Sequence, residues 1–342
     1  MKKLNFIDKL IFVLNSIVAT LLLFSYVLPF LPPKTFAVLS VLSLGVPLLI
    51  LINVLFFLYW LLKVKRQMIL SLLVLLLGYA SFGSVYKFSA TKQLANEYQL
   101  SIMNYNVRLF NVYEWIAEDG IETKLVDFVK KQNPDVLTLQ EYHPREHVDF
   151  SFFKYKFEKL SGNKVKSGQA IFSKYPIINS GSIEFPNTSN NAIFADIVKG
   201  DDTIRVYNVH LQSLKINADV NALKKTDSER LLQRVGNTFK MQQKQTELFV
   251  KHKAECPYKM IISGDFNNTA YSYVYKEVKG DMVDTYKMAG NGFGRTYDFK
   301  FFPVRIDFIL SDKAFQISDF KTYDELYSDH YPIMATVNLK VE

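Results

Sequence analysis

Acids, amides and histidines lie inside or directly after short apolar runs in the second part of the chain. Burying such groups is costly unless they are paired or bound to a metal. One aspartate after a glycine is usually a turn or a cap, and one histidine is usually a hydrogen-bonded surface residue. Repetition at several apolar runs indicates instead one shared site. The residues are Glu141, His210, Asp265, Asn267, Asp307, Asp329 and His330.

Carboxylates from separate strand ends suit a hard divalent cation. Mg²⁺ prefers oxygen ligands and keeps several waters, so one to three carboxylates are enough to hold it. The five histidines show no HExxH spacing, which argues against a zinc protease. The single cysteine, Cys256, excludes an intramolecular disulfide framework and any multi-cysteine zinc site.

Alternating strands and helices must position these residues. Helices are expected at Ile121 to Gln132 and Thr226 to Lys253, and Gly264 permits a tight exit from the strand before Asp265. Strands mixed with helices over about 250 residues predict one α/β domain with sheet packed on sheet or helix. The expected strands are Leu100 to Val107, Val136 to Gln140, Ala170 to Ser173, Ile204 to Leu211, Met260 to Ser263, Ile306 to Leu310 and Ile333 to Leu339.

Charge and hydropathy divide the 342-residue chain near residue 90. Residues 1–90 contain eight Lys or Arg and one acid, Asp8, whereas the rest contains 33 basic and 32 acidic groups. The basic excess therefore flanks the apolar runs, and does not indicate a nucleic-acid surface on the folded domain.

Three stretches of residues 1–90 reach the roughly 20 apolar residues that a membrane-spanning helix needs: Leu10 to Leu31, Phe36 to Leu62 and Met68 to Tyr86. A cleavable signal peptide would explain only one of them. We therefore expect a membrane anchor of three transmembrane helices over residues 1–90 and a catalytic domain over residues 91–342.

The positive charges near the ends of the apolar stretches predict the orientation, because the cytoplasmic side retains Lys and Arg. The first connection, residues 32–35, offers only Lys34. An odd number of spans then places the catalytic domain on the extracytoplasmic, periplasmic side. The charges that predict a cytoplasmic side are Lys2, Lys3 and Lys9 before the first stretch and Lys63, Lys65 and Arg66 in the second connection.

The order of several short strings resembles the endonuclease/exonuclease/phosphatase superfamily, whose members include deoxyribonuclease I-like metal-dependent phosphoesterases. The resemblance implies a four-layer α/β sandwich that hydrolyses phosphoesters with Mg²⁺ or Mn²⁺ at one edge of two central sheets. The strings are NYNVR (104–108), LQE (139–141), GQAIFSKYPI (168–177), VYNVHLQS (206–213), GDFN (264–267), RIDFIL (305–310) and SDH (328–330).

The resemblance also implies a metal-binding set. Glu141 matches the principal metal ligand and Asn106 assists it. Asp329 is expected to complete the metal or phosphate shell.

Catalytic roles follow from the same resemblance. Asp265 would orient or deprotonate the attacking water, and Asn267 would hold the phosphate oxygens. His330, oriented by Asp307, would act on the phosphate during in-line displacement. His210 matches a second histidine found in the deoxyribonuclease I, sphingomyelinase and phosphatase branches. The metal and imidazoles offset charge that develops on the phosphate while a carboxylate prepares water.

Three departures separate the chain from the abasic-site endonuclease branch. Arg108 occupies a place where that branch has an acid, Lys166 replaces its active-site tyrosine, and the branch lacks a histidine at the position of His210. Repair of abasic DNA is therefore disfavoured.

The function expected from the sequence is a membrane-tethered, nuclease-like phosphodiesterase in which water attacks with metal assistance. One alternative is a phosphatase or phospholipase C-like hydrolase of lipid headgroup or sugar phosphates, and another is a noncatalytic membrane receptor or scaffold. The expected partners are a phosphoester substrate, either nucleic acid or a phospholipid or inositol phosphate, and the lipid bilayer; no protein partner is inferred. Asp284, in MVDTY, is assigned either to support of the site or to a strand end or loop.

Overall fold

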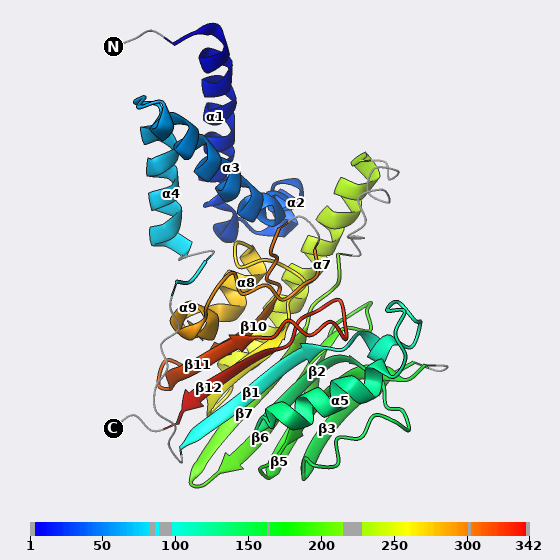
Figure 1. Ribbon diagram of the computed structural model, residues 1–342. Coiled ribbons are helices and arrows are strands. Elements are labelled where there is room, and N and C mark those ends of the chain that lie inside the picture. Colours follow the sequence, from blue (N-terminus) through cyan, green and yellow to red (C-terminus); the bar gives the residue numbers. More distant parts are fainter. Residues whose placement is uncertain are drawn as a thin grey trace.

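Two six-stranded sheets pack face to face in a computed structural model that describes residues 4–82, 86–88, 98–162, 165–214, 228–299 and 302–339 (Figure 1). The first sheet has the order β11 (Gln316–Thr322), β12 (Ile333–Asn338), β1 (Gln99–Asn106), β2 (Val136–Tyr142), β4 (Ser167–Ser173), β3 (Tyr155–Ser161). The second has the order β5 (Ile177–Glu184), β6 (Asn191–Lys199), β7 (Asp202–His210), β8 (Lys259–Asp265), β10 (Asp307–Ser311), β9 (Val283–Asp284).

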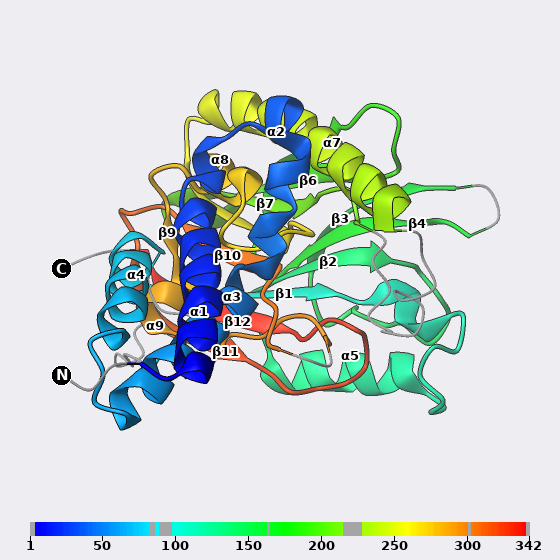
Figure 2. The same cartoon turned by 90° about the horizontal axis from the view of Figure 1, so that it is seen from above.

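Apolar side chains fill the space between the sheets. Ile102 of β1 and Val206 of β7 are fully buried there, in one cluster with residues of the neighbouring strands. Helices cover both outer faces: α5 (Ile121–Gln132) packs on the first sheet, and α7 (Ser228–Ala254) and α8 (Tyr273–Lys279) pack on the second (Figure 2). The predicted two-sheet α/β sandwich is confirmed.

The seven predicted strands and both predicted helices are present with small shifts at their ends. Residues 226 and 227, where the second helix was expected to begin, lie outside the described residues. Strands β3, β5, β6, β9 and β11 were not predicted. β3, β5 and β11 mix polar and apolar residues, as in the half-exposed strands YKFEKLS and IINSGSIE, and β9 has only two residues. β6, NAIFADIVK, contains the apolar run AIFA and was nevertheless missed.

Strand direction brings the candidate residues to one edge. β1 runs parallel to β2, and β7 runs parallel to β8, so the carboxyl ends of each pair meet at the same edge. In the second sheet Asp265 is paired with His210 on one side and with Asp307 of antiparallel β10 on the other. These three polar residues therefore lie side by side because of the register.

The N-terminal part forms three long helices above the sandwich, α1 (Phe6–Ser25), α3 (Leu42–Leu62) and α4 (Met68–Phe82), with the short elements η1 (Leu28–Phe30) and α2 (Pro33–Ser40) beside it (Figure 1). Two segments are long and apolar enough to cross a membrane, Phe6–Phe30 and Pro33–Leu62.

The prediction of three spans is confirmed only in part. In the third expected span the described apolar helix, α4, has 15 residues and rises about 22 Å against a hydrocarbon core of about 30 Å, and residues 83–85 of that span lie outside the described residues. The second expected span is interrupted, since the chain leaves helical geometry at Phe36 and α2 packs against α7 of the sandwich. Helix α3 alone continues away from the domain.

Polar side chains face the inside of this helical group and apolar ones face outward. Asn15 Nδ2 donates to Ser71 Oγ (2.7 Å), Ser71 Oγ donates to Asn53 Oδ1 (3.3 Å), and Trp60 Nε1 donates to Asn15 Oδ1 (3.0 Å). All four residues are buried. Exposed apolar side chains on the same helices include Ile17, Leu21, Leu51, Leu55, Leu73 and Leu77.

Gly264 is required where β8 delivers Asp265 to the edge. Its φ of 150° is in the range that L side chains avoid, and an added Cβ would lie 2.0 Å from the carbonyl oxygen of Val209 in neighbouring β7. We expect Gly264→Ala to lower the free energy of unfolding by about 3 kcal/mol or more, because backbone must move. Gly200→Ala, also at positive φ but facing open space, should cost about 1 kcal/mol. Thermal unfolding of both variants tests this, and equal losses would contradict it.

Candidate active site

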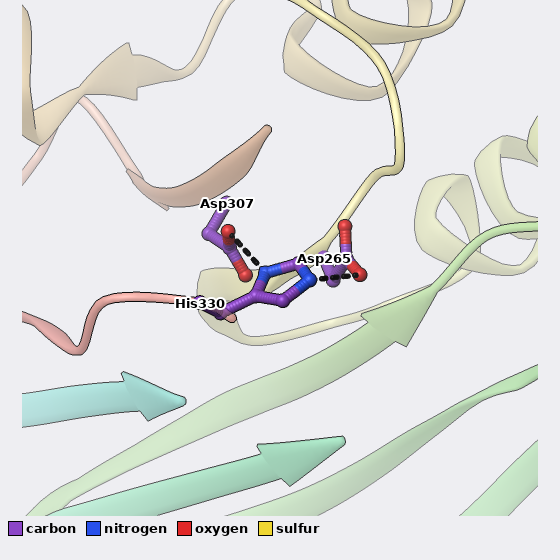
Figure 3. Close-up of side chains that lie close together, drawn as sticks. All are labelled: Asp265, Asp307 and His330. Atoms are coloured by element: carbon purple, nitrogen blue, oxygen red, sulfur yellow. Dashed lines mark hydrogen bonds and ion pairs between the residues drawn. The ribbon is translucent and has the colours of Figure 1, made fainter. Parts of the chain in front are cut away.

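His330 and Asp307 form a buried pair at the edge of the sandwich (Figure 3). His330 Nδ1 lies 2.9 Å from Asp307 Oδ2, and the other ring nitrogen, Nε2, lies 3.8 Å from Asp265 Oδ2. Burial disfavours the imidazolium, but Asp307 and Asp265 outweigh it and raise the pKa of His330 to about 10. The ring is thus held cationic between two carboxylates that come from adjacent strands.

Asp265 is the most heavily hydrogen-bonded carboxylate of the site. It accepts from the backbone N–H of Asn267 (2.7 Å) and from the side-chain amides of Asn267 (3.1 Å) and Asn106 (3.0 Å). Complete burial raises its pKa to about 7, although the charge of His330 opposes the shift. Asn267 itself is anchored by a bond from Nδ2 to the carbonyl oxygen of Leu211 (3.0 Å).

Asn106 and Glu141 reach the same place from the first sheet. Asn106 ends β1, and its Nδ2 lies 3.4 Å from Glu141 Oε1 while its Oδ1 accepts from the backbone N–H of Arg108. Glu141 sits at an irregularity in β2 with a φ of 50°, which turns its side chain out of the strand's regular alternation. About one third of that side chain is exposed, and burial of the rest raises its pKa.

His210 faces both carboxylates with a free ring nitrogen. Its Nε2 is buried, lies 3.8 Å from Asp265 Oδ2 and 4.0 Å from Glu141 Oε1, and has no hydrogen-bond partner. Burial lowers the pKa of His210 to about 3, so this ring is neutral beside the cationic His330. A buried nitrogen without a partner indicates that a ligand completes the site.

Asp329 lies at the rim rather than among the buried acids. Its Oδ2 is paired with Arg108 Nη1 at 3.2 Å, and both side chains are partly exposed. The predicted residues therefore all come to one site, but they form a buried centre and a rim. A cavity of about 220 Å³ opens over the centre, and its polar side is formed by Glu141, Asp265, Asn267, Asp329 and His330.

Two groups of side chains fit a divalent cation differently. One oxygen or nitrogen each of Asp265, Asp307 and His330 lies within 4.8 Å of the others, but the group is buried, and Asp307 Oδ2 and Asp265 Oδ1 already bond to His330 and to the backbone N–H of Asn267. Glu141 has one long hydrogen bond, from Asn106, and opens to the cavity. An oxygen-rich site with room for water is what Mg²⁺ requires, so Glu141 and Asn106 fit it better than the buried group.

Sequence reasoning missed several residues that hold the site together. Ser328 Oγ donates to the carbonyl oxygen of Asn106 (2.8 Å) and accepts from the backbone N–H of His330 (3.2 Å). Tyr297 packs edge-on against the His330 ring at 5.1 Å. Arg108 was noted only as a departure from a related branch, although it pairs with Asp329. The SDH string contained Ser328, but nothing in the sequence indicated its bond to β1.

Asp284 supports the site indirectly. It is buried against Arg305, with Oδ2 2.8 Å from Nη2, and accepts from the hydroxyl of Tyr275 at 2.6 Å. Burial opposes ionisation of Asp284, but Arg305 outweighs it and lowers its pKa. Since Arg305 precedes Asp307 by two residues, this ion pair fixes the start of β10.

Residues 103–330 match the endonuclease/exonuclease/phosphatase family, and the chain belongs to that family. Its members are generally hydrolases of phosphoester bonds and typically depend on a divalent metal. Residues 8–85 match a separate domain family of unknown function. No curated protein matches the chain.

Solved structures share the fold at low sequence identity. An endonuclease/exonuclease/phosphatase from Beutenbergia cavernae is 15% identical, covering 71% of this chain and 72% of its own, with a TM-score of 0.53. A family protein from Bacteroides thetaiotaomicron is 16% identical, covering 71% and 98%, with a TM-score of 0.52. D. rerio TDP2 complexed with a single-strand DNA product is 20% identical, covering 70% and 99%, with a TM-score of 0.51.

The pair of His330 and Asp307 should behave as one unit in catalysis. We expect His330→Ala to reduce kcat by roughly 10²-fold or more, as for other positioned acids and bases. Asp307→Asn should act through the same ring, so the double variant should lose little beyond His330→Ala. A double-mutant cycle on kcat tests this, with the exposed Asp324→Asn as control. Fully additive losses in folded variants would separate the two residues.

Proposed function

We propose that this protein is a membrane-tethered phosphodiesterase that uses Mg²⁺ or Mn²⁺ and attacks phosphorus with water in line with the leaving oxygen. The observation that carries the proposal is the convergence of Glu141, the unpartnered His210 Nε2, Asp265 and the cationic His330 around one cavity. A noncatalytic scaffold has no need of such a costly buried arrangement.

Glu141 and Asn106 would hold the cation, with Asp329 at the outer side. A bound divalent cation stabilises negative charge on a phosphate oxygen as a Lewis acid. Asn106 now directs its amide nitrogen toward the carboxylates and its oxygen toward the N–H of Arg108. Binding through that oxygen requires a half-turn of the amide, which keeps its shape.

The other residues act on water and on the phosphate. Asp265, fixed by the backbone N–H and the side-chain amide of Asn267, orients the attacking water and accepts its proton. Positive charge on His330 stabilises the phosphate oxygens, and Asp307 holds the ring in place. His210 Nε2 is free to hydrogen-bond to a phosphate oxygen or a bound water. The Asn267 side-chain amide donates to Leu211 and Asp265, so it would hold a phosphate oxygen only by giving up one of these two bonds.

Membrane tethering is supported by the inside-out distribution of polarity in α1, α3 and α4. In these helices Asn and Ser are buried while Leu and Ile are exposed. This distribution is the reverse of that in a group of helices surrounded by water, and it suits helices surrounded by lipid. The anchor, residues 1–90, and the catalytic domain, residues 91–342, would then be separate units of one chain. The positive charges of the connection after α3 support a catalytic domain outside the cytoplasm.

The similarity of fold to TDP2, which was solved with a single-strand DNA product, supports nucleic acid as the substrate class. Phospholipid is the class that the walls of the cavity favour. Both contain the phosphodiester that the proposed chemistry requires.

Activity should depend on Glu141 through metal binding. With full-length protein in lipid nanodiscs, Mg²⁺ or Mn²⁺ should support hydrolysis of a water-soluble nitrophenyl phosphodiester, and chelation should abolish it. We expect Glu141→Gln, which keeps the shape but removes the charge, to lower both Mg²⁺ affinity and turnover by about 10²-fold. Glu255→Gln, on an exposed residue after α7, serves as the control. Wild-type Mg²⁺ binding by Glu141→Gln in calorimetry would exclude Glu141 as the ligand.

The topology makes a separate prediction. A reporter fused after Lys92 should be active only outside the cytoplasm, because we propose α4, although short, as a third crossing. A fusion after Lys65, in the basic connection between α3 and α4, should report the cytoplasm. Cytoplasmic activity of a stable fusion after Lys92 would overturn the orientation.

A further inference from the structure

One wall of the active-site cavity is apolar and belongs in part to the N-terminal helices. The polar groups described above line one side, and aliphatic and aromatic side chains line the other. Phe299 and Phe302 stack edge to face at 5.0 Å in this wall. The apolar lining is Leu44, Leu214, Phe299, Phe302, Val304 and Ile306.

Leu44 reaches the cavity from the first turn of α3. It packs on a small cluster with Leu214, which precedes α7, and Phe239 of α7. Its neighbour Ser43 accepts a hydrogen bond at its carbonyl from Thr269 Oγ1 (3.0 Å), and Thr269 also lines the cavity. The start of α3 is therefore joined to the active-site wall and is not a loose tether.

The length of α3 sets the level of this cavity relative to a bilayer. Its 21 residues rise about 30 Å, the thickness of the hydrocarbon core. A spanning α3 therefore has its first turn, with Leu44, at the boundary between hydrocarbon and headgroups. The apolar wall of the cavity continues there into the lipid-facing surface of the helix.

A second, polar recess lies on the other side of Glu141. It measures about 70 Å³, and Glu141 and His210 line it together with neutral side chains. Among its described lining residues there is no Lys or Arg. The amide nitrogens of Gln169, Asn190 and Asn191 already donate within the protein. Gln169 Oε1, which has no partner, and the serine hydroxyls can pair with the hydroxyls of an uncharged polyol. These neutral residues are Ser161, Ser167, Gln169, Ser189, Asn190 and Asn191.

We propose that the substrate is a bilayer-resident phospholipid with a polyol headgroup, an inference that rests on the proposed function. In this proposal the phosphate lies between Glu141 and His330. The headgroup enters the polar recess, and the start of the acyl chains lies along Leu44 and Phe302. Water forms the new bond to phosphorus, and the bond from phosphorus to the diacylglycerol oxygen breaks. The proton lost by water ends on that oxygen, which leaves as diacylglycerol while the polyol phosphate is released.

The test compares one headgroup with and without acyl chains. Full-length protein in lipid nanodiscs is given phosphatidylglycerol, its deacylated form glycerophosphoglycerol, a single-stranded oligonucleotide and the soluble nitrophenyl diester, each with Mg²⁺ or Mn²⁺. We expect kcat/KM for phosphatidylglycerol to exceed that for glycerophosphoglycerol, with diacylglycerol as product. Leu44→Gln should lower this ratio about tenfold, a usual factor for one apolar contact.

Matched variants separate the cavity wall from general effects on the helix. Leu48→Gln, one turn further along α3 and exposed, should keep the wild-type ratio. Phe302→Ser changes the same wall from the catalytic domain, and should lower the ratio even if Leu44→Gln fails to insert.

The outcomes distinguish the two proposals. Equal kcat/KM values for phosphatidylglycerol and glycerophosphoglycerol would overturn the lipid substrate, and so would a wild-type ratio of these values in both Leu44→Gln and Phe302→Ser. Hydrolysis of the soluble diester would still uphold the proposed phosphodiesterase activity. Cleavage of the oligonucleotide without cleavage of phosphatidylglycerol would overturn it in favour of nucleic acid. No metal-dependent hydrolysis of any of the four would remove both proposals.

Discussion

A layer of buried amide hydrogen bonds between the two sheets holds the active site together. Asn208 of β7 donates to the carbonyl oxygens of Leu139 and Ala170 in the first sheet at 2.8 and 3.1 Å. Gln140 of β2 donates to Asn208 Oδ1 (2.5 Å) and to Asn104 Oδ1 (2.8 Å). Apolar contacts alone allow sheets to slide, whereas buried polar groups are satisfied in only one register. This layer therefore fixes one sheet relative to the other.

The site depends on that register because its residues come from both sheets. Asn106 and Glu141 belong to the first sheet, and His210, Asp265 and Asp307 belong to the second. Sliding one sheet over the other would move these two groups of side chains apart. The buried amide hydrogen bonds lie one or two residues from the site residues along β2 and β7. The same strands therefore carry both these bonds and the side chains of the site.

The helical part is joined to the sandwich by specific contacts. The backbone N–H of Lys34 donates to Gln243 Oε1 (2.7 Å), and Lys34 Nζ lies 2.6 Å from Glu247, both on α7. Together with the bond from Thr269 to Ser43, these contacts place α2 and the start of α3 beside the cavity. Fixed contacts of this kind give the catalytic domain one orientation relative to the helices, and with it one direction from which substrate reaches the cavity.

Much of this protein could be predicted from local sequence. Apolar runs identified the strands that end at the site, and the strings GDFN and SDH identified Asp265 and His330, because burial and turn chemistry act on neighbouring residues. Other features depend on residues that are distant in sequence. The pairing of Arg108 with Asp329, the bond from Ser328 to Asn106 and the entry of Leu44 into the cavity wall follow from packing across about 100 to 290 positions. The sequence by itself determined which chemical groups are available and the ends of which strands carry them. Only the tertiary structure decided which of these groups are hydrogen-bonded to one another, which lie at the rim and which helix closes the cavity. Hydrogen bonds and burial depend on distances that chain order does not encode.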